Sequence, residues 1–199
     1  MNGQHSFELA ATDGKLIRGD RSIGKDRQIL FITGFLSKRW GNKSKALAQW
    51  CEEKGWGFCC YDVRGFGDSE GSFTDYTLSD WIADARLVLD TLKGGPPITI
   101  VGNSLGSWIA WLMAKEFEQI ERLVLIAPAF NMMGVRARSI SEERRHAWLT
   151  DGVDALGRRS LAQGLAAFVE VGRRKRSLLE DQLRSSQARE HHDLAWAAR

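Results

Sequence analysis

The sequence predicts an α/β fold, a mostly parallel β-sheet with helices on both faces, for a chain of 199 residues. Two observations lead to this prediction. Short apolar runs alternate with helical patterns in the order β-α-β-α-β-α-β. The apolar runs are continuous rather than alternating, which is typical of strands buried on both faces. With 43% hydrophobic residues, the chain can form one domain with a sizeable core but not two.

Four apolar runs are predicted to be the parallel strands, at residues 28–35, 57–65, 97–102 and 120–128. The segment before them, residues 7–19, predicts a hairpin with Asp13 and Gly14 at its turn. We expect this hairpin to add antiparallel strands at one edge of the sheet.

The intervals between the strands have helical patterns, at residues 44–55, 77–95 and 104–117. Gly55 is suited to end the first helix, and Thr77 or Ser79 to cap the second. The apolar faces expected to be buried are Ala46, Leu47, Trp50 and Cys51 in the first helix and Trp81, Ala85, Val88 and Leu92 in the second.

The composition of the chain changes after about residue 130. No proline follows Pro128, and Lys175 is the only lysine after residue 130, whereas arginines are frequent there. We therefore divide the chain into residues 1–150, an α/β core with the start of a lid, and residues 151–199, an arginine-rich helical tail.

Net charge and cysteine content limit the partners, metal sites and cellular location that we expect. A net charge of +3 and the lack of a long apolar run predict no nucleic-acid partner and no membrane span. The basic run at residues 172–177 is explained by a solvated helix face. Cys51, Cys59 and Cys60 have neither a disulfide pattern nor zinc-ligand spacing, so we expect buried thiols, no metal and a cytoplasmic location.

The pentapeptide GNSLG places Ser104 between a predicted strand and a predicted helix. In this context the pattern GxSxG predicts a nucleophile elbow, a tight turn that exposes the serine at the carboxyl edge of the sheet. Gly102 and Gly106 would be required because side chains there would collide with the turn and the helix. The Leu105 N–H could donate to an oxyanion. The alternative is an ordinary βα turn with a capping serine.

Two loops accompany this turn. The loop at residues 33–43 leaves the neighbouring strand, and the backbone N–H of Phe35 is suited to complete an oxyanion hole. The glycine-rich loop at residues 61–72 could bind phosphate, but its GxGxxxG spacing differs from the GxGxxG pattern. We expect instead that Asp62, Arg64 and Asp68 fix a surface turn through local hydrogen bonds.

The segments ILFITGFLS, YDVRGFGDSEG, VGNSLGSWIAWLMA and LVLIAPAF resemble successive landmarks of the α/β-hydrolase superfamily. Within it they resemble the small serine hydrolases related to a mitochondrial depalmitoylating thioesterase. The resemblance covers residues 28–150. It implies Ser104 as nucleophile, Phe35 and Leu105 as backbone oxyanion donors, and a lid that begins in residues 131–148. No cofactor is implied.

A serine nucleophile also needs a base. In this fold the order along the chain is the serine, then an acidic residue, then the histidine that acts as base. His192, or its neighbour His191, is a candidate base, and Asp181 precedes both. His5 and His146 are expected to be solvated. No further strand is predicted between the acid and the base, so the C-terminal part of the family pattern is not found.

The function expected from the residues and the resemblance is hydrolysis of a carboxylic ester or thioester through an acyl-serine. The substrate would be a small molecule with a hydrophobic acyl group, bound at an apolar mouth formed by Leu36, Phe35, Trp108, Met132 and Met133. The alternative is an inactive remnant or binding module, truncated or frameshifted near Thr150 and lacking the acid and base. The oligomeric state stays open.

Overall fold

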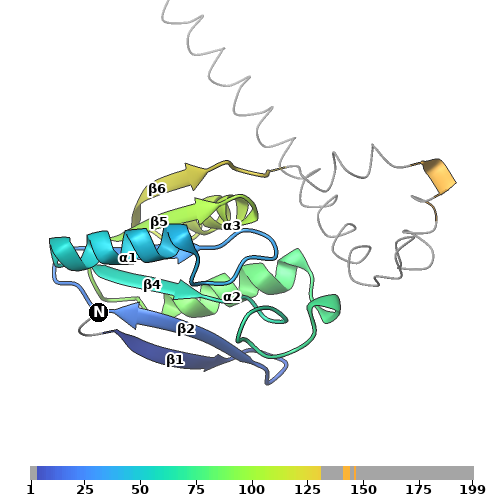
Figure 1. Cartoon of the computed structure of the whole chain (residues 1–199), viewed down its shortest axis with the longest axis horizontal. Coiled ribbons are helices and arrows are strands. Elements are labelled where there is room, and N and C mark those ends of the chain that lie inside the picture. The colour runs from blue at the N-terminus through green and yellow to red at the C-terminus, as the bar shows by residue number, and fades with distance from the viewer. Residues whose placement is uncertain (1–3, 131–140, 144–145, 147–199) are drawn as a thin grey trace, which may run out of the picture.

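A computed structural model provides the structure, and it describes residues 4–130, 141–143 and 146. These residues form one six-stranded sheet with helices on both faces, in the strand order β1-β2-β4-β3-β5-β6 (Figure 1). The predicted α/β class is confirmed. The expected boundary at residue 150/151, the tail and most of the expected lid lie outside the described residues.

An antiparallel hairpin forms one edge of the sheet. It consists of β1 (His5–Ala10) and β2 (Leu16–Ser22), and β2 pairs antiparallel with β4. Gly14 lies in the turn with φ of 78°, a left-handed conformation that glycine adopts without steric cost. The predicted hairpin and its place at the sheet edge are therefore correct.

The remaining strands are β3 (Gln28–Ile32), β4 (Gly57–Tyr61), β5 (Ile98–Asn103) and β6 (Ile120–Ile126). They pair in parallel, β4 with β3, β3 with β5 and β5 with β6. Every residue of β3 and β4 is buried, as their continuous apolar runs predict. The carboxyl ends of these strands meet at one edge, where ligands bind in open α/β sheets.

The helices are α1 (Asn42–Lys54), α2 (Leu78–Asp90) and α3 (Leu105–Ala114), with a short 3₁₀ helix, η1 (Phe73–Asp75), before α2. Two separate apolar clusters show that α2 and α3 cover one face of the sheet and α1 the other. Figure 1 shows α1 alone on the near face. None of the helices in the described part of the chain is long and apolar enough to cross a bilayer.

The buried face of α1 agrees with the predicted one only at Cys51. Ser44, Ala48 and Cys51 are buried, whereas Trp50 is 41% exposed. The apolar residues Ala46, Leu47 and Trp50 instead line a groove beside the helix. In α2 the predicted stripe is buried up to Val88, but the helix ends at Asp90, so Leu92 follows it.

Candidate active site

Ser104 lies in the turn between β5 and α3 with φ of 53° and ψ of −114°. A non-glycine residue with positive φ is uncommon and strained, and such residues gather at functional sites. The serine is half-buried, and its side-chain oxygen has no hydrogen-bond partner among the described residues. The geometry thus meets the steric requirement of the predicted turn, while the catalytic role of Ser104 stays a prediction.

The two glycines of the pentapeptide allow close approach of backbone segments. A Cβ atom at Gly102 would lie 2.5 Å from the carbonyl oxygen of Gly106, and one at Gly106 would lie 2.3 Å from the carbonyl oxygens of Ile32 and Thr33. These contacts involve backbone, which has little freedom to move. Glycine is therefore required at both positions for α3 to pack against β5 and β3.

Strand β6 holds the turn from the other side. The Ser104 N–H donates to the carbonyl of Ile126 at 2.9 Å, and the Ala129 N–H donates to the carbonyl of Ser104 at 3.2 Å. The fully buried Ser107 hydroxyl donates to the carbonyl oxygens of Gly102 at 2.7 Å and Ile126 at 3.2 Å. The sequence reasoning missed Ser107, although a lone hydroxyl in an otherwise apolar helical run was a usable signal.

The loop between β3 and α1 lies against the serine. A Cβ atom at Gly34 would be 3.2 Å from the Cβ of Ser104. The next residue is Phe35, and neither its N–H nor that of Leu105 donates to any described residue. Unpaired amides at a helix start and an adjoining loop are the usual donors of an oxyanion hole. This geometry is consistent with the roles predicted for Phe35 and Leu105, which stay predictions.

Arg39 anchors the same loop. Its backbone N–H donates to Asp62 Oδ1 at 2.6 Å, and its Nη1 donates to Asp62 Oδ2. Its Nε donates to Asp20 Oδ2 at 2.6 Å, and Nη1 also contacts Asp68 Oδ2 at 2.7 Å. The indole N–H of Trp40 donates to Asp20 as well, at 2.7 Å. One guanidinium therefore ties the loop to β2 and to the segment after β4, a role that the sequence did not reveal.

The charges of this network support one another. Burial alone would raise the pKa of Asp20, but hydrogen bonds from Arg39, Ser6 and Trp40 lower it below its ordinary value. Burial opposes the charge of Arg39 too, yet the surrounding carboxylates raise the pKa of its guanidinium. Asp20 and Arg39 are therefore both charged, as the two partners of a fully hydrogen-bonded buried ion pair are.

The glycine-rich loop after β4 is held partly by the local bonds expected. The Asp68 N–H donates to Asp62 Oδ2 at 3.1 Å. Asp62 and Arg64 are, however, buried rather than at the surface. A Cβ atom at Gly67 would lie 2.3 Å from Asp62 Oδ2, so a carboxylate fills the space that a phosphate would need. This contact argues against phosphate binding at the loop.

The expectation that Arg64 bonds locally is wrong. Its Nε donates to Asp84 Oδ1 at 2.6 Å and its backbone N–H to Asp84 Oδ2 at 2.9 Å, twenty positions along the chain in α2. Its Nη1 lies 3.2 Å from Asp13 Oδ2 at the hairpin turn. Burial raises the pKa of Asp84 to about 6, although Arg64 opposes this shift.

The expected apolar mouth is only partly present. Leu36 is 53% exposed, and Phe35 packs against the rings of Phe73 and Trp81, at centroid distances of 5.4 and 6.1 Å. Trp108 is 3% exposed and belongs to the core cluster, so its proposed place in the mouth is wrong. Met132 and Met133 lie outside the described residues.

Two of the four histidines, His5 and His146, lie within the described residues. His5 is exposed, as expected, but begins β1 rather than preceding the fold, and His146 is exposed. The candidate base His192, its neighbour His191 and the candidate acid Asp181 lie outside the described residues. The base and the acid therefore remain predictions.

All three cysteines are free and buried, as predicted. Burial raises the pKa of the Cys51 thiol to about 11 and that of Cys59 to about 12, and it raises the pKa of Cys60 further. Protonated, enclosed thiols are poor nucleophiles and poor metal ligands. Among the described residues no cluster of cysteine, histidine and carboxylate side chains could hold a metal ion.

Comparison with curated proteins identifies relatives of similar sequence. Palmitoyl-protein thioesterase ABHD10, mitochondrial, from Rattus norvegicus is 37% identical over 124 residues, which are 62% of this chain and 41% of that protein. The Homo sapiens protein of the same name is 32% identical over 121 residues, 60% of this chain and 39% of that one. The chain thus spans about two fifths of the length of these curated relatives.

Several solved structures have a fold similar to that of this chain. Alpha/beta hydrolase domain-containing protein 10 from mouse has a TM-score of 0.68 and 28% identity, covering 74% of this chain and 59% of that one. A putative hydrolase from Agrobacterium vitis S4 has a TM-score of 0.69 and 24% identity, covering 83% and 71%, and shows the fold. Residues 25–153 match the family described as serine aminopeptidase, S33. The chain therefore belongs to the serine aminopeptidase S33 family, within the α/β-hydrolase superfamily.

Proposed function

We propose that this chain is a serine hydrolase that cleaves a carboxylic ester or thioester through an acyl-serine at Ser104. The observation that carries the proposal is the strained turn at Ser104, beside the amides of Phe35 and Leu105, which donate to none of the described residues. A serine in this conformation has its hydroxyl at the carboxyl edge of a parallel sheet. Preorganised donors there stabilise a developing negative charge.

In the proposed reaction, Ser104 Oγ attacks the carbonyl carbon of the substrate and gives its proton to a base. The carbonyl oxygen becomes an oxyanion that accepts hydrogen bonds from the Phe35 and Leu105 amides. The intermediate collapses, and the leaving alcohol or thiol takes the proton from the base. Water then attacks the acyl-serine, which releases the acid and restores the hydroxyl. His192, oriented by Asp181, is proposed as the base.

A hydrophobic acyl group is the proposed substrate feature. Phe35, Phe73 and Trp81 form an aromatic group at the loop beside Ser104, with Phe66 packed on Phe73 at 6.4 Å. The curated relatives, which are named palmitoyl-protein thioesterases, support the same feature. A cytoplasmic location remains a proposal from the reduced cysteines.

A fluorophosphonate probe, which phosphonylates an activated serine, tests the proposal. The full chain should be labelled, and Ser104→Ala should remove the labelling. Ser72→Ala, which changes an exposed serine in the glycine-rich loop, is the matched control and should label normally. Folding of each protein is checked by circular dichroism.

Two outcomes would contradict the proposal. Folded wild-type protein without labelling would support the inactive alternative, because loss of a triad base lowers kcat by about 10⁶ and leaves mainly binding and the oxyanion hole. Labelling that survives Ser104→Ala would place the reactive group elsewhere. If labelling behaves as expected, p-nitrophenyl esters of increasing acyl length report whether hydrophobic acyl groups are preferred.

A further inference from the structure

A pocket of about 220 Å³ lies at the carboxyl edge of the sheet, between the start of α1 and the ends of β3 and β5. A single water needs only about 10–15 Å³ of such space, so the pocket can hold a group of several atoms. It adjoins the candidate nucleophile, because Gly34 lines it and a Cβ atom at Gly34 would lie 3.2 Å from the Cβ of Ser104. The polar residues of its lining include Thr33, Lys38, Asn42, Lys43, Ser44 and Asn103.

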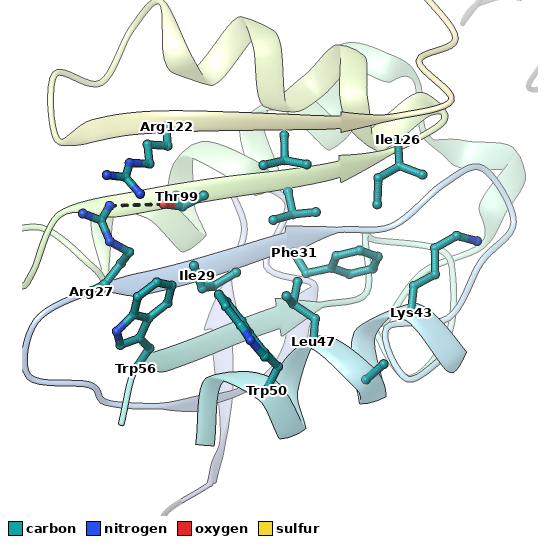
Figure 2. Close-up of a pocket in the computed structure, with 13 residues that line it drawn as sticks. Arg27, Ile29, Phe31, Lys43, Leu47, Trp50, Trp56, Thr99, Arg122 and Ile126 are labelled. Atoms are coloured by element: carbon teal, nitrogen blue, oxygen red, sulfur yellow. Dashed lines mark hydrogen bonds between the residues drawn. The ribbon is translucent and has the colours of Figure 1, made fainter. Parts of the chain in front are cut away.

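Positive charge at this pocket is not balanced by nearby carboxylates. No acidic residue lines the pocket, and neither Lys38 nor Lys43 has an acidic partner among the described residues. The first turn of α1 contains no acidic residue either, although the start of a helix carries a partial positive charge that acidic side chains commonly complement. Figure 2 shows Lys43 at the start of α1, away from Arg27 and Arg122 at the other end of the sheet face. The pocket therefore favours an anion.

The start of α1 also provides hydrogen-bond donors. The backbone N–H groups of Asn42 and Lys43 donate to no described residue, as expected for the first turn of a helix. The Gly41 N–H, by contrast, donates to the Ser44 hydroxyl at 2.8 Å. Unpaired amides at a helix start are suited to bind the oxygens of a phosphate group.

A buried hydroxyl gives independent evidence of a ligand. Thr33 is 9% exposed and lines the pocket, and its Oγ1 has no hydrogen-bond partner among the described residues. In that part of the chain only the Tyr61 hydroxyl is both unpartnered and sealed from solvent, so Thr33 Oγ1 opens to the pocket. The side-chain amide of Asn103 also lines the pocket without a described partner. Because buried polar groups are normally hydrogen-bonded, these side chains indicate a polar ligand.

We propose that this pocket binds a phosphate group, either as the free ion or as part of an organic ligand. Lys38 and Lys43 balance its charge, and the α1 amides and the Thr33 hydroxyl donate to its oxygens. A phosphate presents several strong acceptor oxygens, which suits a lining composed of donors. Binding of this kind requires no reaction at Ser104, so it is independent of the proposed hydrolysis.

A nuclear magnetic resonance titration of the isotope-labelled full chain with inorganic phosphate, at constant ionic strength, tests the site. The amide signals of Asn42 and Lys43 should shift and saturate, with a dissociation constant in the millimolar range. Lys38→Met and the isosteric Thr33→Val should each weaken binding at least about fivefold, because each removes a hydrogen bond to a charged group. Lys45→Met is the matched control and should bind like wild type, since Lys45 is exposed on α1 but does not line the pocket.

Phenyl phosphate distinguishes the two sources of the phosphate group. Tighter binding than that of inorganic phosphate, with an additional shift of the Leu105 amide, would show that an organic ligand extends from the pocket to Ser104. Equal affinity without a change at Leu105 would show that the pocket takes the free ion. Either result supports a phosphate site.

Three results would overturn the proposal. The first is shifts that do not saturate, and the second is saturable shifts confined to residues outside the pocket. The third is the same affinity in Lys38→Met, Thr33→Val and Lys45→Met, which would show general attraction between the anion and a basic surface.

Discussion

Replacing Arg39 by methionine tests how the loop beside Ser104 is held in place. Methionine keeps an unbranched apolar side chain but removes the guanidinium. The change leaves Asp62 and Asp20, 1% and 6% exposed, without their cationic partner. Both carboxylates keep some hydrogen bonds, since the Arg39 and Asp68 backbone N–H groups still donate to Asp62 and the Trp40 indole to Asp20.

The expected loss of stability follows from these remaining bonds. Removing one partner of a buried ion pair costs about 3–5 kcal/mol. Because each carboxylate retains donors, we expect the lower end, about 3 kcal/mol in the free energy of unfolding, which is about a hundredfold in the folding equilibrium. In the native protein the pKa of Asp20 is lowered, so this stability is present above the unfolded pKa of about 3.9 and is lost at lower pH.

Urea unfolding monitored by circular dichroism at pH 7 and pH 3 measures the effect. The control is Arg86→Met, which breaks an exposed pair with Glu116 and should cost less than about 1 kcal/mol. The loss in Arg39→Met should shrink at pH 3, because the stability that follows from the lowered pKa of Asp20 is lost as the pH falls. Equal losses in the two variants at pH 7 would refute the view that Arg39 anchors the loop.

Three further predictions concern packing, protonation and thiol reactivity. Gly106→Ala places a methyl group 2.3 Å from backbone carbonyls and should destabilise by about 3 kcal/mol, or prevent folding, whereas Gly41→Ala, with open space around it, should cost less than about 1 kcal/mol in the same urea assay. Burial raises the pKa of Asp84 to about 6, so its stabilising effect is greatest below the unfolded pKa of about 3.9 and is lost as the pH rises through 6. Wild type should therefore gain about 1 kcal/mol over Asp84→Asn between pH 7 and pH 5, and no change between these pH values would show that Asp84 stays ionised in the folded protein. Cys59 and Cys60 should react with Ellman's reagent only as fast as the protein unfolds, and fast reaction in native buffer would contradict their burial.

Local patterns were sufficient to predict most of the sheet and the turn at Ser104. Strands β3 and β4 are continuous apolar runs because both of their faces are covered, and this requirement is visible in consecutive residues. The turn at Ser104 depends on Gly102 and Gly106, two residues away on either side, whose missing side chains are visible in the pentapeptide itself. The hairpin at Gly14 was predictable for the same reason, since its turn chemistry is local.

The contacts that position the candidate site were decided by the tertiary structure. Arg39 meets Asp62 and Asp20 only because the strand order places β4 between β2 and β3, and no local pattern records that order. Ser107 and Arg64 likewise find partners about twenty residues away. The exposed face of α1 shows the same limit, because an apolar stripe indicates that a surface is to be covered but not which segment covers it. Propensity acts along the chain, whereas charge pairing and packing act through space, and only the assembled fold brings those partners together.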